Sequence, residues 1–293
     1  MDASVRWLTE PPALKEPVLV VMLTGWIDAA AAAAGAMEAI REESEASPIV
    51  TFDDDVYIDY RARRPLMELR DGVNTVLQWS HISVAAGHDQ TGRDLLLLTG
   101  PEPDMAWHRF AEVAGDLASD LGVSRMVALG AYPFTAPHTR PPRVSVSSPS
   151  QDVLTSVPFL RSSVDVPAGM AAVLEHAMHD RGIPALGVWA QVPHYITTSS
   201  YPPASVALLD ALRDAADVVI DGTEVRQDAI SLRQRLDELV AGNEDHQRMV
   251  AQLETLHDAA DEDTTVDGLG STLEMRSGDE LAAELEQFLR DQE

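Results

Sequence analysis

The chain has 293 residues, of which 48 are acidic and 21 are basic, and its formal net charge is -27. An apolar content of 45% predicts a chain that folds around a large core. The absence of cysteine excludes disulfide scaffolds, cysteine nucleophiles and thiolate metal sites. Lys15 is the single lysine and lies between prolines, so Walker-type phosphate binding and Schiff-base chemistry are nearly excluded.

The negative charge also restricts the partners that the chain can bind. A surface of this charge repels nucleic-acid phosphates and anionic lipid, and the sequence contains no basic patch that would offset it. Residues 18–37 form the most apolar stretch, but a membrane span there would bury the carboxylate of Asp28. We therefore expect a soluble, cytoplasmic protein that binds neither nucleic acid nor membrane.

The first part of the chain predicts a strand, a helix and then several strands. Residues 18–23 form an apolar run of strand length, and the alanine-rich residues 29–40 predict a helix that packs closely on a sheet. Short β-branched or leucine-rich runs follow with little helix between them. They predict strands over residues 49–52, 56–60, 75–79 and 94–98. This section is typical of an antiparallel or mixed sheet with a hairpin excursion.

After Gly100 strands and helices alternate again, which is the pattern of an α/β fold. Helices are predicted over residues 104–121, 168–181 and 204–215, and strands over 125–129, 143–146 and 185–191. From residue 227 the apolar spacing predicts a helical hairpin that breaks near Gly242 and Asn243.

An acidic linker over residues 261–267 and a last helix over 280–290 are expected to follow the hairpin. The expected organisation is a sheet domain over 1–222, a helical hairpin over 223–260, and the linker with its terminal helix over 261–293. Residues 243–293 hold 15 acidic and 3 basic side chains, so this segment carries nearly half of the excess charge. It predicts either a solvated tail or a surface for a basic partner.

Polar residues follow four of the predicted strands. Because the carboxyl ends of parallel strands meet at one edge of a sheet, these loops are expected to converge where such folds bind ligands. The catalytic candidates among them are Asp28, Glu102 and His194. The ligand-binding candidates are Trp26, Asp104, His138, Arg140 and Tyr195.

Each candidate also has a purely structural interpretation. Asp28 and Asp104 begin predicted helices, where a carboxylate caps the helix and favours its dipole. His138 and Arg140 suit an anion, but they equally suit a hydrogen-bond network that holds a long loop. His194 and Tyr195 have the residue types of an acid/base pair, or they cap the core.

Other motifs give little support for catalysis. The sequence lacks a G-x-S-x-G nucleophile motif and a glycine-rich phosphate loop. His176 and His179 share a helix face, but two histidines without further ligands usually form a surface pair. We expect no metal and no cofactor.

Five motifs together resemble the proteasome assembly chaperone 2 family in its actinobacterial branch. They are Gly25-Trp26-Ile27-Asp28, residues 59–65 (DYRARRP), Gly100-Pro101-Glu102-Pro103-Asp104, residues 137–141 (PHTRP) and Val192-Pro193-His194-Tyr195. The resemblance implies an α/β sandwich like that of the phosphorylase/hydrolase fold, with a mixed central sheet and a C-terminal helical extension. It also implies a homo-oligomer, with a trimer expected.

Two functions are compatible with these observations. The first is a non-catalytic oligomer that resembles proteasome assembly chaperones and acts through protein contacts, with the acidic C-terminal helices as a second partner surface. The second is a small-molecule protein or enzyme that binds a nucleoside- or sugar-phosphate-like ligand at the strand ends. Family members dock on proteasomes through a terminal hydrophobic-tyrosine-any motif, whereas this chain ends Arg290-Asp291-Gln292-Glu293. The sequence favours the first function.

Overall fold

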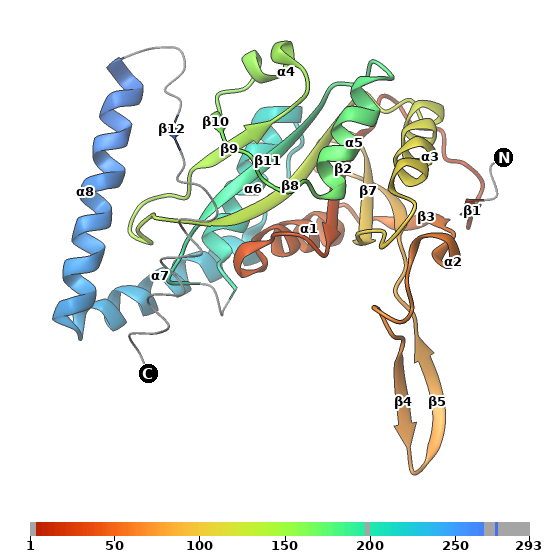
Figure 1. The fold of residues 1–293 in the computed structure, drawn as a ribbon, viewed down its shortest axis with the longest axis horizontal. Coiled ribbons are helices and arrows are strands. Elements are labelled where there is room, and N and C mark those ends of the chain that lie inside the picture. The colour runs from red at the N-terminus through yellow and green to blue at the C-terminus, as the bar shows by residue number, and fades with distance from the viewer. Residues whose placement is uncertain (1–3, 197–199, 267–272, 275–293) are drawn as a thin grey trace.

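The computed structural model describes residues 4–196, 200–266 and 273–274, and a mixed eight-stranded sheet forms its centre (Figure 1). The strand order is β1-β3-β6-β7-β2-β8-β11-β9. The central strands β7, β2, β8 and β11 are parallel, and antiparallel strands flank them. The strands are β1 (Val5–Trp7), β2 (Val18–Thr24), β3 (Ser47–Phe52), β6 (Ser83–His88), β7 (Asp94–Pro101), β8 (Arg125–Phe134), β9 (Val144–Ser147) and β11 (Ala185–Pro193). The predicted mixed α/β sheet is confirmed.

Helices cover both faces of the sheet (Figure 1). Helices α1 (Ala32–Glu43) and α6 (Pro202–Ala216) pack on one face, and α3 (Trp107–Asp120) and α5 (Met170–His179) pack on the other. In β7, Leu95 and Leu97 join the first core while Leu96 and Leu98 join the second. This burial on both faces explains why the central strands are continuous apolar runs rather than alternating ones.

The alanine-rich composition of α1 allows it to lie close to α6. A Cβ added at Gly35 would lie 2.8 Å from Ser205 Oγ of α6. The same hydroxyl donates a buried hydrogen bond of 2.8 Å to the carbonyl oxygen of Ala32. Small side chains therefore determine the spacing between these two helices.

The region between β3 and β6 differs from the sequence prediction. Residues 56–60 were predicted as a strand, but Asp54–Tyr57 form the helical turn α2, so this prediction is wrong. The carboxylate of Asp53 caps the turn by accepting the N–H of Asp55, and Tyr57 is fully buried against Phe110. The local cap and the aromatic contact outweigh the strand propensity of the apolar residues.

A long hairpin leaves the sheet domain after α2. Its strands β4 (Leu66–Arg70) and β5 (Val73–Gln78) pair only with each other in the described structure and project away from the body (Figure 1). The strand predicted over residues 75–79 corresponds to β5. The sequence analysis did not predict β4, β6 or β1. We call residues 66–78 the arm.

The C-terminal part of the described chain consists of two helices with the predicted break between them. Helices α7 (Thr223–Ala241) and α8 (Glu244–Val266) are separated at Gly242 and Asn243. Figure 1 shows α8 running crosswise to α7 rather than packed back along it as expected for a hairpin. The two helices together are called the C-terminal hairpin below. Asn243 Oδ1 caps α8 by accepting the backbone N–H of Asp245 at 2.9 Å. The linker expected from residue 261 is wrong up to 266, because α8 continues there, and the expected helix over 280–290 lies outside the described residues.

Three further short elements are η1 (Ala29–Ala31), α4 (Gln151–Thr155) and the pairing of β10 (Ser162–Ser163) with β12 (Leu273–Glu274). Within the described residues, every helix is too short or too polar to cross a membrane.

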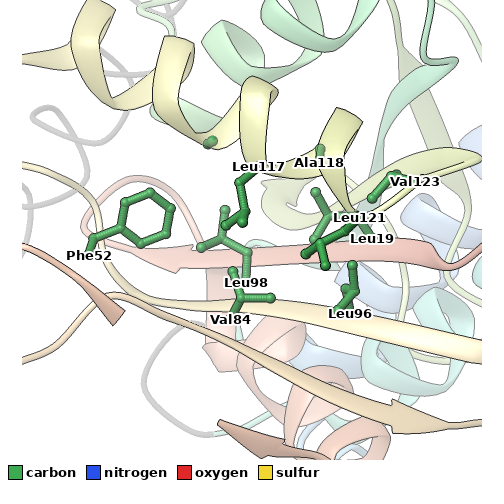
Figure 2. Close-up of a pocket in the computed structure, with 10 residues that line it drawn as sticks. Leu19, Phe52, Val84, Leu96, Leu98, Leu117, Ala118, Leu121 and Val123 are labelled. Atoms are coloured by element: carbon green, nitrogen blue, oxygen red, sulfur yellow. The ribbon is translucent and has the colours of Figure 1, made fainter. Parts of the chain in front are cut away.

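A small cavity lies in the core between α3 and the sheet (Figure 2). Its volume is about 10 Å³. The residues that line it come from β2, β3, β6, β7, α3 and the turn after α3, and all of them are apolar, for example Leu19, Phe52 and Leu117. A void of this size and lining is a packing gap rather than a ligand site.

The packing of β8 against β11 gives a stability prediction. A Cβ at Gly130 would lie 2.3 Å from the ring of Trp189, its neighbour on β11. Gly130→Ala should therefore lower the free energy of unfolding by about 1–3 kcal/mol, because the indole must move. Chemical denaturation measures this, with Gly242→Ala as the control, because a Cβ there meets no atom closer than 3.7 Å. Equal stability of both variants would contradict the packing argument.

Candidate functional site

The four loops that carry the predicted site residues lie at one edge of the sheet. They follow β7, β2, β8 and β11, which are adjacent and parallel, so their carboxyl ends share that edge. The side chains, however, gather in two groups. One lies at the ends of β2 and β7, and the other at the ends of β8 and β11 beneath the C-terminal helices.

Glu102 is the centre of the first group. Glu102 is 9% exposed, and its Oε1 accepts the backbone N–H of Met170 in the first turn of α5. A Cβ at Gly169 would lie 2.9 Å both from this Oε1 and from Cδ1 of Trp26, so the missing side chain lets the two groups approach. A helix N-terminus is where a phosphate or carboxylate ligand binds. Here the chain's own carboxylate occupies that position.

Asp104 joins the strand-end loop to the base of the arm. Its two carboxylate oxygens share a bifurcated hydrogen bond from Arg63 Nε–H, at 3.0 and 3.1 Å, and one of them also accepts the backbone N–H of Asp59 at 3.0 Å. The Arg63 guanidinium also lies against Gly25, where an added Cβ would be 3.0 Å from it. Charge-assisted bonds of this kind are stronger than neutral ones. Asp104 therefore positions the arm, a role that residue type alone did not indicate.

Asp28 holds the start of α1. Its two carboxylate oxygens accept the N–H groups of Ala33 at 2.8 Å and Ala34 at 3.0 Å. Burial raises the pKa of Asp28, while these backbone bonds act in the opposite direction. The preceding Ala30 and Ala31 have φ of 53° and 51°, a left-handed conformation that costs about 1–2 kcal/mol per residue. The cap stabilises this tight entry into the helix.

His138 and Tyr195 form the second group. Tyr195 Oη accepts the backbone N–H of His138 at 2.7 Å and lies 2.8 Å from its Nδ1. Because the phenolic oxygen already accepts one N–H, its own proton is placed to bond to Nδ1. The ring proton then sits on Nε2, which is 3.3 Å from Asp237 Oδ1 of α7. Burial, followed by the charge of Arg233, lowers the pKa of His138 and favours this neutral form.

Arg140 binds α8 rather than an open site. Its Nε and Nη2 donate to the two carboxylate oxygens of Asp258 at 2.8 and 2.7 Å, and its Nη1 donates to Glu254 at 3.0 Å. Thr139 donates to the same Glu254 carboxylate, and Arg233 Nη1 of α7 donates to the carbonyl oxygen of His138 at 3.1 Å. The loop after β8 is thus covered by both C-terminal helices.

His194 is exposed, as are Trp26 and Asp104. Its backbone N–H donates to the carbonyl oxygen of Phe134 at 3.0 Å, and its ring stacks edge-on against Tyr195 with centroids 5.5 Å apart. Burial raises the pKa of Tyr195 to about 12, and its hydroxyl bonds to His138 rather than to His194. The two residues are therefore in contact, but their polar atoms do not form a direct acid/base pair.

Glu175 is a buried carboxyl group that the sequence analysis missed. It lies on α5 and is 3% exposed, and it accepts a hydrogen bond of 3.0 Å from Ser147 Oγ, which in turn accepts one of 3.1 Å from Trp189 Nε1. Burial raises the pKa of Glu175 to about 7. The available signal was a glutamate between Leu174 and Ala177 on the apolar face of a helix.

The fold and its polar groups define a mixed α/β sheet protein whose strand-end loops bind the protein's own helix ends and C-terminal hairpin. The sequence profile of the PAC2 family matches residues 22–240, more than half of the chain. The chain belongs to the PAC2 family. No functionally curated protein matches it.

Several solved structures are similar to this chain. A protein of unknown function from Corynebacterium glutamicum is 30% identical, with a TM-score of 0.81, and the match covers 88% of this chain and 98% of that one. A proteasome-assembly chaperone homologue from Mycobacterium tuberculosis is 32% identical, with a TM-score of 0.73 and coverage of 80% and 99%. An archaeal proteasome activator from Pyrococcus furiosus is 15% identical, with a TM-score of 0.60 and coverage of 80% and 98%, and shares the fold.

The contacts of Arg140 predict how the helical hairpin is attached. Arg140→Ala removes the bidentate pair with Asp258 and the bond to Glu254, so the amides of α8 should exchange hydrogen faster while those of the central strands stay unchanged. Hydrogen-exchange mass spectrometry measures this. Arg248→Ala is the matched control, because its partner Asp245 lies on the same helix. Equal exchange in both variants would show that the Arg140 contacts do not hold α8.

Glu175 predicts a dependence of stability on pH. The folded state raises the carboxyl pKa from 4.5 to about 7, so the proton stabilises the folded state below the unfolded pKa. This stabilisation is lost as the pH rises from about 4.5 to about 7, by at most about 3–4 kcal/mol at about 1.4 kcal/mol per pKa unit.

Glu175→Gln lacks this titration. The free energies of unfolding of this variant and of the parent protein are measured by urea denaturation at pH 5 and pH 8. The difference between them should favour the variant more at pH 8 than at pH 5. Glu254→Gln, at a residue with no comparable burial, should not reproduce this change. A parallel pH dependence in Glu175→Gln and the parent protein would contradict the assignment.

Proposed function

We propose that this protein is a non-catalytic homo-oligomer, a trimer, that acts through protein–protein contacts as proteasome assembly chaperones do. One observation carries the proposal, namely the arm with its apolar side chains exposed. Seven large apolar residues of the arm and its base are more than 40% exposed, including Leu66 at 64% and Val73 at 61%. Exposed apolar patches of this kind mark sites where a protein binds another protein.

The contacts that the arm makes within the chain do not bury these apolar side chains. An isolated two-stranded hairpin is marginally stable in water, and one with apolar residues on both faces invites aggregation. At its base, Trp79 stacks on Tyr60 with centroids 4.7 Å apart, and Arg63 is held by Asp104. The arm is thus presented in a fixed direction, as a surface for association requires.

The relatives support the same class of function. Structures at 30–32% identity include the proteasome-assembly chaperone homologue, and the more distant archaeal activator shares the fold. In this proposal residues 1–222 form a cytoplasmic, self-associating domain of phosphorylase-like architecture. The hairpin from residue 223 then offers a second surface to a basic partner, through exposed residues such as Ile230 and Leu239 beside its acidic side chains.

The small-molecule alternative has weaker support from the site. A phosphate-like ligand would need the N-terminus of α5 and the guanidinium of Arg140. Glu102 occupies the first, and Asp258 and Glu254 occupy the second. A ligand would have to displace both sets of internal contacts.

The proposal is tested by the mass of the protein in solution. Light scattering after size exclusion should give a trimer for the parent protein, and Met67→Ser with Leu77→Ser should shift it towards the monomer. These two residues are directly paired across the strands and half exposed, so their loss leaves the core intact. Ile230→Ser with Leu239→Ser is the control, because these exposed residues lie on α7, away from the arm. A parent protein that is monomeric would contradict the proposal.

A further inference from the structure

We propose that the arm of one copy seats in a groove beside α6 of a second copy, so that copies associate head to tail. This inference rests on the proposed self-association and adds the surface that receives the arm. It joins the exposed apolar arm to an open, largely apolar groove of the described chain.

The groove lies between α6 and the two segments at the outer edge of the sheet. Its volume is about 400 Å³, and it is lined on one side by residues 141–144 and 158–160. Three prolines, Phe159 and Leu160 make this wall largely apolar. The other wall is one face of α6, formed by Pro203, Val206, Ala207, Asp210, Ala211 and Asp214. The small side chains of this face leave the groove open.

The arm has one face that matches an apolar groove. The strand register shifts between Glu68 and Leu69, and the extra residue lies on β5, so β4 keeps its regular alternation. Met67 and Leu69 therefore share a face with Leu77, which pairs directly with Met67. All three are 44–52% exposed. The opposite face carries Leu66, Val73 and Val76 beside the bonded side chains of Glu68, Arg70 and Gln78, so the Met67 face is the one without charged side chains.

Length and charge also match. Strands of five or six residues extend about 17–20 Å, and the α6 wall from residue 203 to 214 extends about 16 Å. The arm itself holds one arginine and two acidic residues, whereas its base, residues 60–65, holds three arginines and no acidic residue in a chain of net charge -27. Asp214 on the α6 wall has a side chain 46% exposed and pairs with the neighbouring Arg213 at 3.4 Å, so it remains accessible to a second arginine. These opposite charges favour encounter between the base of the arm and the groove.

The positions of the two elements favour contact between copies. The arm lies in the chain between β3 and β6, near one edge of the sheet, whereas β9 and the groove lie at the other edge. Figure 1 shows the arm projecting away from α6. Because the two surfaces are different, the contact is heterologous, and such contacts close into rings when the rotation between copies allows it. A trimeric ring satisfies every arm and every groove.

Disulfide cross-linking tests the seating directly, because the chain has no cysteine of its own. Leu69→Cys protein and Ala207→Cys protein of different tag length are mixed, allowed to exchange subunits and oxidised. A mixed disulfide between the two species is expected on a non-reducing gel. Leu66→Cys, on the other face of the arm, is the matched control and should lose most of that product. As a second measurement, Ala207→Arg places a long side chain in the groove from the half-buried face of α6, and the oligomer should shift towards the monomer.

The outcomes separate this inference from the proposed function. Two results together would overturn the seating of the arm in the groove: an oligomer that persists in Ala207→Arg, and no mixed disulfide between the Leu69→Cys and Ala207→Cys proteins. The proposed self-association would still stand. Cross-linking of Leu69→Cys to itself would replace the groove by an arm-to-arm contact. A parent protein that is monomeric in light scattering overturns both proposals.

Discussion

Four parallel strands buried on both faces set the position of everything else in this protein. Alternate leucines of β7 enter two different cores, so the strand cannot slip by one residue without placing each leucine in the wrong core. Because β7, β2, β8 and β11 run in the same direction, their following loops share one edge. The polar residues of those loops must find partners there, and they find them within the chain.

Charge explains which partners they find. The loop after β8 contributes Arg140 and Arg143, whereas the C-terminal hairpin is strongly acidic and binds this loop through Glu254 and Asp258. The excess of acidic residues is therefore partly structural, because it attaches the hairpin to the sheet domain. The same contacts occupy the groups that an anionic ligand would need, which supports the proposed function over the small-molecule alternative.

The arm and the groove extend this division of roles. Glu102 and Arg140 at the strand ends are internally bonded, while the apolar residues of the arm remain exposed. Asp104 and Arg63 connect the two regions, since they fix the base of the arm to the loop after β7. In the proposed association, one ion pair thus couples the arm to the edge of the sheet. The groove beside α6, which lies at the opposite edge of the sheet, is the surface proposed to receive the arm.

The sequence by itself determined the α/β class, most central strands and helices, and the break between α7 and α8 at Gly242, because these features depend on local periodicity and capping. Helix capping was one of the two interpretations of Asp28, and its carboxylate does bond to Ala33 and Ala34. Asp104 had the same interpretation, but it binds Arg63 instead. The strand predicted over residues 56–60 is wrong, because the burial of Tyr57 favours a helical turn there. Only the tertiary structure paired Arg140 with Asp258, more than 110 residues away, and Glu102 with Met170. Such pairs are determined by the packing of elements that are distant in the chain, and the local sequence does not indicate which acidic residue binds which arginine.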